Sequence, residues 1–408
     1  MALRHVNSEK PIPKYNRSLA SLFTIALLFF VFTFAGENFA KTVEPPDQDY
    51  LVYVVCESAD KIAVVRFGPA GARVDRLIDT GFMPSDLDGP HGIVFSPDRK
   101  HFYVSLGHGR PFGSVWKYST EDDSVVGKAT LGMFPATMDV SADGNFLYVV
   151  NFNLHGDMVP SSVSIVLTEL MKEIARVPTC TMPHGSRIAT SSGKQYSACM
   201  MNDMLVEVDT STLKVSRHFV LTKGKEMGIN GSPSSQDLSK HQSHDAGGHG
   251  MEPPKPGDVT CSPTWAQPST DGKSVYVACN KSDEIVEVDA ATWKVVRRMP
   301  ARAGVYNLAV TKDKRLIATN KRDQSISIYD LKSGRELARI PTKRKVIHGA
   351  VVSFDDRYAF ISVEGIGSDP GTVEIIDLAA LKTVATVDVP EQAAGIDFYR
   401  TETPSRER

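Results

Sequence analysis

Short apolar runs separated by turns recur along the chain from residue 50 onward. The first three runs are residues 50–56, 61–67 and 72–78, and each is bounded by Gly, Pro, Asp or Ser. Runs of this length, rich in Val, Ile, Tyr and Phe, are typical of β-strands. Segments with a helical period are scarce, so the pattern predicts an all-β fold.

The strand pattern is itself repeated. The stretch Pro90-His91-Gly92 leads into an apolar run, a Ser-Pro-Asp turn and a second apolar run, and related stretches return roughly every 45 residues. The copies are Pro135-Ala136-Thr137, Pro183-His184-Gly185, Pro263-Thr264-Trp265, a less regular one near Val305, and Ile347-His348-Gly349. A period of this length indicates an array of small, similar sheets.

The two ends of the array complete one another. The N-terminal unit shows only three strands, and residues 394–399 supply a fourth at the other end of the chain. The sequence therefore predicts a seven-bladed β-propeller of four-stranded blades over residues 50–400, with the first blade closed by the C-terminal strand. Residues 41–49 are expected to be a linker, 224–259 a His- and Gly-rich loop insertion, and 401–408 a disordered tail.

A second register supports the alignment of the blades. Cys56, Cys199 and Cys279 each end an apolar run and each precede an Asp by four positions. Small residues at equivalent strand positions are expected to be buried, so these three thiols are predicted to be inert.

Several strands carry a family pattern. Tyr148-Val149-Val150-Asn151, the related run 276–280 and the Ala-Asp-Gly turn at 142–144 resemble the YVTN-repeat seven-bladed β-propeller family, within the superfamily that includes the cytochrome d1 and nitrous oxide reductase N-terminal propellers. The resemblance implies the fold and an exported location. It does not select an activity, because such propellers serve as binding platforms, cofactor sites and enzymes.

The N-terminal segment agrees with export. Basic residues precede an uncharged apolar run at 19–36, which is typical of a secretory signal peptide and is also long enough for an uncleaved membrane anchor. We therefore expect residues 1–40 to be one or the other, and the remainder to be periplasmic or secreted and monomeric. The net charge of −2 offers no basic surplus for a nucleic-acid partner.

The histidines gather on one face of the predicted propeller. Loops between second and third strands lie on the same face as the segments entering each blade, and eight of the eleven histidines fall there: His91, His108, His155, His184, His241, His244, His249 and His348. One hypothesis is that His91, His184 and His348 bind a metal or a flat cofactor, copper or haem, at the channel mouth, with His155, His244 and His249 as further ligands. The alternative is that these histidines hydrogen-bond neighbouring blades.

Soft ligands stand beside one of these histidines. Cys180, Met182 and His184 occupy alternate positions, a set of side chains that copper accepts. The other interpretations are a disulfide between Cys180 and Cys261 or two free structural thiols. The three histidines of the 224–259 insertion bind a metal in one interpretation and belong to a solvated lid or linker in the other.

No nucleophile elbow, phosphate loop, zinc-protease motif or haem-attachment motif is present. The first hypothesis for function is therefore an exported binding module that holds a small ligand or a partner protein on its looped face. The alternatives are a copper- or haem-binding redox protein and a lactonase-like hydrolase. The hydrolase alternative rests on Pro-His-Gly followed by Ser-Pro-Asp at 90–98, which is similar to the propeller lactonases.

Overall fold

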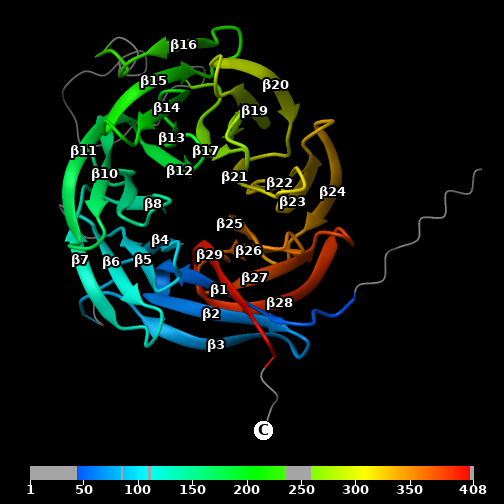
Figure 1. The fold of residues 1–408 in the computed structure, drawn as a ribbon. Coiled ribbons are helices and arrows are strands. Elements are labelled where there is room, and N and C mark those ends of the chain that lie inside the picture. The colour runs from blue at the N-terminus through cyan, green and yellow to red at the C-terminus, as the bar shows by residue number, and fades with distance from the viewer. Residues whose placement is uncertain (1–43, 84–85, 109–111, 236–258, 405–408) are drawn as a thin grey trace, which may run out of the picture. The chain divides into compact units, whose positions relative to one another are not determined.

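The computed structural model describes residues 44–83, 86–108, 112–235 and 259–404. These residues form seven antiparallel β-sheets arranged as blades around a central channel (Figure 1). The prediction of an all-β, seven-bladed propeller is confirmed.

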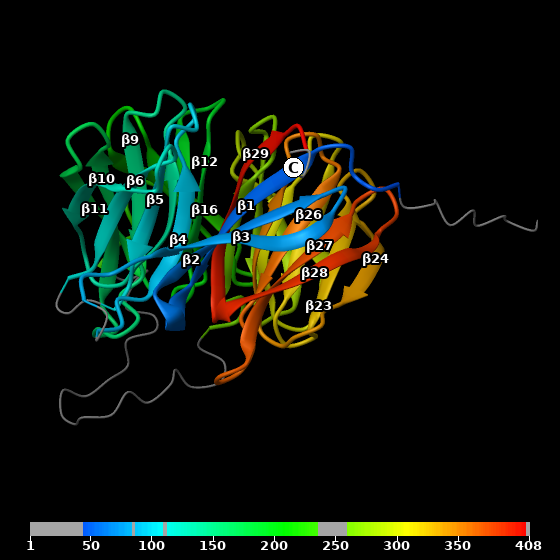
Figure 2. The same cartoon turned by 90° about the horizontal axis from the view of Figure 1, so that it is seen from below.

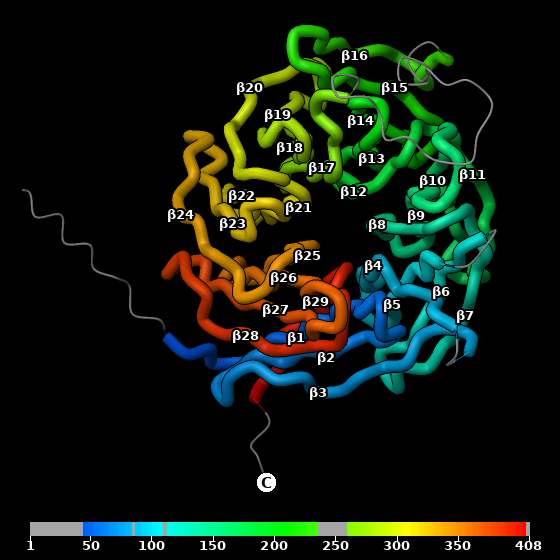
Figure 3. Tube along the Cα trace, turned by 180° about the vertical axis from the view of Figure 1, so that it is seen from behind, coloured from blue at the N-terminus to red at the C-terminus, as the bar shows by residue number. Residues whose placement is uncertain are grey.

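Each blade runs from an inner strand at the channel to an outer strand at the rim, as the view from behind shows (Figure 3). From the inside outward, blade 1 consists of β29 (Ala393–Glu402), β1 (Asp49–Cys56), β2 (Lys61–Gly68) and β3 (Gly71–Asp79); blade 2 of β4 (Pro90–Phe95), β5 (His101–Leu106), β6 (Ser114–Ser119) and β7 (Val125–Thr130). Blade 3 consists of β8 (Pro135–Val140), β9 (Phe146–Asn151), β10 (Pro160–Leu167) and β11 (Lys172–Thr181); blade 4 of β12 (Pro183–Ala189), β13 (Lys194–Cys199), β14 (Met204–Asp209), β15 (Lys214–Val220) and β16 (Met227–Asn230). Blade 5 consists of β17 (Pro263–Pro268), β18 (Ser274–Cys279), β19 (Glu284–Asp289) and β20 (Lys294–Pro300); blade 6 of β21 (Val305–Val310), β22 (Arg315–Asn320), β23 (Ser325–Asp330) and β24 (Arg335–Pro341); blade 7 of β25 (Ile347–Val352), β26 (Tyr358–Val363), β27 (Pro370–Asp377) and β28 (Lys382–Glu391).

The C-terminal strand closes the ring as predicted. β29 pairs antiparallel with β1, and the two strands lie side by side in Figures 1 and 2. The pairing reaches further than expected, because Asp49 faces Glu402 and Tyr50 faces Thr401. Residues 401 and 402 are therefore part of the strand, and the prediction of a disordered tail from 401 onward is wrong for these two positions.

The core lies between neighbouring blades. Second and third strands are apolar on both faces because each blade packs against the next, as where Tyr50 and Phe67 of blade 1 contact Tyr358 of blade 7. Outer strands alternate partly buried and exposed residues, since only one face is covered. Burial of apolar surface in this ring of interfaces is the main stabilising term of the fold.

The insertion between blades 4 and 5 begins with a strand. β16 pairs with β15 and adds a fifth strand to blade 4, so the prediction that 224–259 is a loop is wrong for residues 227–230. Residues 236–258, which include His241, His244 and His249, lie outside the described residues.

The cysteines pair differently from the predicted arrangements. Cys180 forms a disulfide with Cys199, and Cys261 forms one with Cys279. The suggested Cys180–Cys261 bridge is therefore wrong, as is the prediction that Cys199 and Cys279 are inert thiols. The strand positions are equivalent as expected, but in blades 4 and 5 the segment entering the blade brings a second cysteine beside them. Only Cys56 is free, and burial raises its pKa to about 12.

In blades 1, 4 and 5, an aspartate in the turn after the second strand binds the segment that enters the next blade. Asp203 accepts hydrogen bonds from the backbone N–H groups of Thr260, Cys261 and Ser262, which lead into β17. Asp60 accepts from the N–H groups of Asp88 and Gly89, which lead into β4. The recurring Asp thus accepts hydrogen bonds from backbone N–H groups just before an inner strand, which have no partner strand to bind.

The apolar run at 19–36, predicted as a signal peptide or anchor, also lies outside the described residues. Within the described part of the chain, no helix has the length and apolar character needed to cross a bilayer.

Candidate functional site: the channel mouth

Two rings of equivalent positions line the mouth of the channel on the looped face. The first ring is the second residue of each inner strand, and from blade 1 to blade 7 it consists of Ala394, His91, Ala136, His184, Thr264, Tyr306 and His348. The second ring is the residue directly after each second strand, and in the same order it consists of Glu57, Gly107, Phe152, Met200, Asn280, Lys321 and Glu364. We call these the inner ring and the outer ring.

The glycine that follows each mouth histidine allows the blades to approach closely. A Cβ atom at Gly92 would overlap the Ala136 carbonyl, and one at Gly185 would overlap the Thr264 carbonyl. The Gly92 N–H donates to Ser105 Oγ (2.9 Å), which in turn donates to the Ala136 carbonyl (2.7 Å). The glycine therefore fixes the inner strands close together, and the preceding histidine is held at the channel axis.

Glu57 holds two histidines. Its Oε2 accepts from Nδ1 of His91 (2.9 Å) and its Oε1 from Nε2 of His108 (2.9 Å). Burial would raise the pKa of Glu57, but the charge of His91 and the hydrogen bonds from both rings outweigh it and lower the pKa to about 2. The hydrogen bond from His108 to Glu57 outweighs burial and raises the pKa of His108. An ionised carboxylate only accepts, so His91 carries a hydrogen on Nδ1.

Nε2 of His91 is left without a partner. His91 is only 7 % exposed, and its Nε2 atom is buried and has no hydrogen-bond partner among the described residues. Buried polar atoms in proteins are nearly always paired with protein, water or a ligand. The atom is therefore an unused hydrogen-bonding position at the mouth.

His184 is fully hydrogen-bonded. Its Nδ1 donates to the Thr264 carbonyl (3.0 Å), and its Nε2 accepts from the Tyr306 hydroxyl (3.0 Å). Burial and the charge of His91 lower the pKa of His184 to about 3, which keeps the ring neutral. His184 thus behaves as the alternative interpretation of these histidines predicts, as a bond between blades.

His348 and Tyr306 continue the inner ring toward blade 7. Nε2 of His348 lies 3.5 Å from the Tyr306 hydroxyl oxygen and 4.0 Å from Oε1 of Glu364. Burial and then the charge of Lys321 hold the pKa of His348 well below its usual value. The mouth therefore contains neutral imidazoles beside a few charged groups.

Lys321 and Glu364 form an ion pair next to Tyr306. Nζ of Lys321 lies 3.1 Å from Oε1 of Glu364 and 3.9 Å from the centre of the Tyr306 ring. Burial alone would lower the pKa of Lys321, but Tyr306 and Glu364 outweigh it and raise that pKa. Together with Glu57, these residues make the half of the mouth at blades 6, 7, 1 and 2 polar. We call this the polar half.

The other half of the mouth is apolar. Phe134, Ala136, Phe152 and Met182 form a buried cluster with the partly buried Met133, Leu154, Met200 and Met201 around it. The His91 ring meets Phe134 edge-on at 5.2 Å, and the His184 ring meets Phe152 at 4.8 Å. We call this cluster, at blades 3 and 4, the apolar half.

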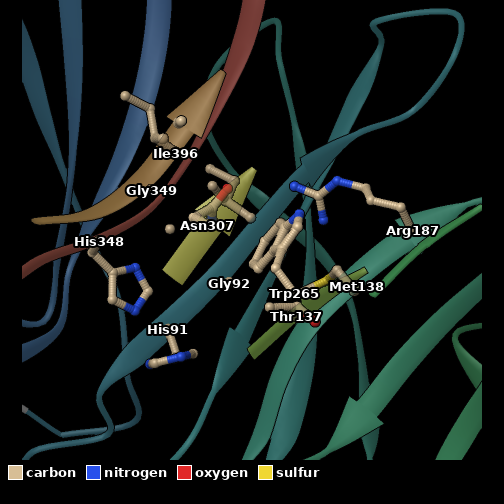
Figure 4. Close-up of a pocket in the computed structure, with 13 residues that line it drawn as sticks. His91, Gly92, Thr137, Met138, Arg187, Trp265, Asn307, His348, Gly349 and Ile396 are labelled. Atoms are coloured by element: carbon tan, nitrogen blue, oxygen red, sulfur yellow. The ribbon is translucent and has the colours of Figure 1, made fainter. Parts of the chain in front are cut away.

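A narrow cavity runs inward from the mouth (Figure 4). His91 and His348 line one end, Arg187 and Trp265 the other, and Asn307 lies between them. The cavity measures about 20 Å³, which is room for one ordered water molecule or one small group.

The structure brings the three predicted histidines together. The ring centres of His91 and His348 are 5.3 Å apart and those of His91 and His184 6.0 Å. His155 stands further out, its ring 5.5 Å from that of His108. Met182 packs in the apolar half, whereas His244 and His249 lie outside the described residues.

The predicted ligand set does not fit a metal ion as proposed. Cys180 is in a disulfide and so offers no thiolate, which corrects its assignment as a ligand. Nε2 of His184 already accepts from Tyr306. Within the described ranges, no three His, Cys, Asp or Glu side chains are arranged to hold a metal ion. The copper alternative therefore has no set of three such ligands among these residues, and the copper or haem alternative stays a prediction.

Sequence reasoning missed Glu57, Tyr306 and Lys321 as members of the site. Glu57 and Lys321 each come directly after a second strand of a blade. These strands end at Cys56 and Asn320. The sequence feature that could have identified Glu57 and Lys321 is their charge, because the equivalent positions in blades 3 and 4 are the apolar Phe152 and Met200. Tyr306 follows Val305, where the repeat is less regular, and its hydroxyl contacts with His184 and His348 depend on the ring geometry.

Comparison with known proteins supports the fold. A family model described as "Lactonase, 7-bladed beta-propeller" matches residues 42–155, which include Glu57, His91 and His108. No curated protein matches the chain.

Solved structures resemble the propeller at low sequence identity. A functionally unknown protein from Desulfotomaculum acetoxidans shares 13 % identity with a TM-score of 0.61, covering 86 % of this chain and 99 % of that one. The periplasmic gluconolactonase PpgL of Pseudomonas aeruginosa shares 16 % identity with a TM-score of 0.61, covering 87 % and 100 %. The dihydro-heme d1 dehydrogenase NirN shares 15 % identity with a TM-score of 0.55, covering 87 % and 75 %. This chain is thus a seven-bladed propeller similar in fold to proteins of different activities.

Proposed function

We propose that the protein is a binding module whose channel mouth holds a small organic ligand with one polar edge and one apolar face. The unpartnered Nε2 of His91 carries the proposal, because it stands at the boundary between the polar and the apolar half. Ligand sites are typically concave, mostly apolar and provided with a few placed polar groups, and the mouth has this composition.

Rigidity of the polar groups supports the proposal. Glu57 fixes the orientation of the His91 ring, and neither His184 nor His348 takes up charge at neutral pH, since burial lowers the pKa of both. A ligand therefore meets hydrogen-bonding groups that are already oriented, which reduces the entropy lost on binding.

The test uses δ-valerolactone and its open form, 5-hydroxyvalerate, as probes, because each combines a polar end with an apolar methylene face. We expect binding by calorimetry, and a rise in Kd of at least about tenfold in His91→Leu, which removes the free nitrogen. His101→Leu is the matched control, since His101 begins β5 away from the mouth. Equal affinity in His91→Leu and the wild type would contradict the proposal.

A second candidate function is hydrolysis of a small lactone. The specific observation in its favour is the Glu57–His91 pair, in which Nδ1 carries a hydrogen and Nε2 of the neutral imidazole accepts a proton from water. The water oxygen would add to the ring carbonyl, the ring C–O bond would break, and the proton on His91 would pass to the leaving alkoxide. The match of residues 42–155 to a lactonase family model also favours this candidate.

Turnover of δ-valerolactone, followed by acid release at constant pH, separates the two candidates. If the protein is a hydrolase, Glu57→Gln should lower the rate by roughly 10² or more, because Glu57 orients His91, the general base, and a positioned general base contributes about 10²–10⁴. Binding of δ-valerolactone without turnover would support the binding module and exclude hydrolysis of this lactone.

We also propose that the protein is exported. Two buried disulfides support this location, because such bonds persist in oxidising compartments. Fractionation of cells that express the full chain tests it: the protein should appear outside the cytoplasm with both disulfides oxidised, and a reduced cytoplasmic protein would contradict it.

A further inference from the structure

Methionines gather in the apolar half of the mouth. One is the buried Met182, and three more are partly buried against the same cluster, so that the group consists of Met133, Met182, Met200 and Met201. They come from two neighbouring blades, whose inner strands β8 and β12 lie side by side at the channel (Figure 3). Four of the thirteen methionines of the chain therefore meet at one place on the looped face.

The repeat does not require methionine at these positions. Met200 and Met201 directly follow a second strand, and in each of the other six blades at least one of the two equivalent residues is polar or charged: Glu57-Ser58, Gly107-His108, Phe152-Asn153, Asn280-Lys281, Lys321-Arg322 and Glu364-Gly365. Met182 directly precedes an inner strand, a position that glycine takes in blades 2 and 6. The packing common to the blades thus does not account for these three side chains.

The backbone that carries three of the methionines is firmly held. The N–H of Met200 donates to the carbonyl of Met182 (3.1 Å), and the N–H of Thr181 donates to Oδ1 of Asn202 (2.6 Å). The Cys180–Cys199 disulfide ties the same two segments together, two residues before Met182 and one before Met200. A methionine side chain is unbranched and has three rotatable bonds, so the thioethers can adapt to a ligand while their backbone stays in place.

The chemistry of these side chains favours a soft, singly charged metal ion. A thioether sulfur is a soft donor of the kind that Cu(I) accepts. The donors are neutral, so they leave the charge of a bound ion uncompensated, and a single charge costs less to bury than a double one. The cysteines beside the cluster are in disulfides and offer no thiolate, which leaves the thioethers as its soft donors.

We propose that Met133, Met182, Met200 and Met201 form a binding site for a soft monovalent metal ion, Cu(I) or its analogue Ag(I). The thioethers bind the ion, and Phe134 and Phe152 shield it from water. Of the copper ligands expected from the sequence beside Cys180 and His184, only Met182 belongs to this site. The site goes beyond the proposed function, because it needs no organic ligand and contains no group of the polar half.

The experiment measures Cu(I) binding to the full chain by competition with the chelator bicinchoninate under anaerobic conditions. It uses a background of His241→Gln/His244→Gln/His249→Gln, because the imidazoles of the insertion are themselves copper ligands. This protein should retain one equivalent of Cu(I). Met200→Leu/Met201→Leu should raise the Kd at least about tenfold, since it removes two donors and nearly preserves the side-chain volume.

Met138→Leu/Met171→Leu is the matched control, because these two buried methionines belong to a separate core cluster between blades 2 and 3. The Kd for Cu(I) should be unchanged in it, and circular dichroism confirms that each variant is folded. In protein labelled with ¹³C at the methionine methyl groups, Ag(I) should shift the signals of the four clustered residues and not those of Met138 and Met171.

Two results would overturn the site. One is that the protein retains no Cu(I) against the chelator, which would leave the four methionines with a packing role alone. The other is equal retention by folded Met200→Leu/Met201→Leu and the control, which would place the ion elsewhere. Neither result bears on the proposed function, because that is tested with δ-valerolactone and His91→Leu in the absence of metal.

Discussion

The two halves of the channel mouth are built on the same repeat and are held in different ways. In the polar half, Glu57, His91 and His108 are joined by charge-assisted hydrogen bonds, and Lys321 pairs with Glu364. The apolar half is held covalently and by backbone capping instead: the Cys180–Cys199 disulfide joins blades 3 and 4 next to Met182 and Met200. The comparison teaches that equivalent positions of the repeat carry different residue types where they face the channel, because each blade has different neighbours there.

Loss of the disulfides should have the largest effect, and it should fall on the apolar half. The bridges close loops with sequence separations of 19 and 18 residues, and a loop of this length corresponds to about 3 kcal/mol for each bond. We expect the double replacement Cys180→Ala/Cys199→Ala to lower the free energy of unfolding by roughly that amount in a urea titration.

Cys56→Ala is the control for this measurement, because it removes a buried thiol at the equivalent strand position without removing a bond. A loss no greater than that of the control would show that the bridge does not stabilise the apolar half.

Replacing the aspartates in the turns after second strands should have an intermediate effect on the free energy of unfolding. Asp203, on the side of the apolar half, is 1 % exposed and also accepts from the hydroxyls of Thr222 and Thr260. Asp60, which holds the entry to His91, accepts two backbone bonds. Asp203→Ala should therefore cost about 2–3 kcal/mol of unfolding free energy, and Asp60→Ala about 1–2 kcal/mol.

Denaturant unfolding of the two variants checks this order. Calorimetry with δ-valerolactone adds a second readout, since Asp60→Ala should weaken binding through the displaced entry of β4. Equal losses of stability in the two variants would remove the proposed difference in how the halves are held.

The pH dependence of stability should show the smallest effect. The pKa of His184 falls to about 3 on folding, and that of His348 also falls well below 6.5, so the unfolded chain binds more protons below pH 6.5. Their contribution is fully present above pH 6.5 and is lost as the pH falls toward the folded values. Each histidine adds a slope of at most about 1.4 kcal/mol per pH unit below that point.

Urea titrations between pH 7 and pH 6 measure this slope, and over that interval the two histidines together should change the free energy of unfolding by roughly 1.4 kcal/mol. The wild type should lose more stability over this interval than His184→Gln/His348→Gln, whose glutamines do not titrate. His108 acts in the opposite direction because its pKa is raised, so His108→Gln should steepen the loss. Parallel profiles for the wild type and the double variant would show that the two rings are not held neutral.

Much of the fold follows from local pattern. Period-2 alternation, Asp-Gly turns and a repeat of about 45 residues specify strands and blades, because each blade is built from the same pairing of neighbouring strands. The extra strand β16 was missed because its four residues are mostly exposed and include Gly228 and Asn230, types that are depleted in strands, and only pairing with β15 makes them a strand.

The sequence by itself determined the propeller, its closure by the C-terminal strand and the placing of His91, His184 and His348 at one mouth. Only the tertiary structure decided the cysteine partners, since pairing depends on which segments meet across blades. It also decided that both ring nitrogens of His184 have partners, that Nε2 of His91 has none among the described residues, and that Glu57 holds His91 and His108. The physical reason is that hydrogen-bond partners around a channel come from residues far apart in the chain, so spacing along it does not specify them.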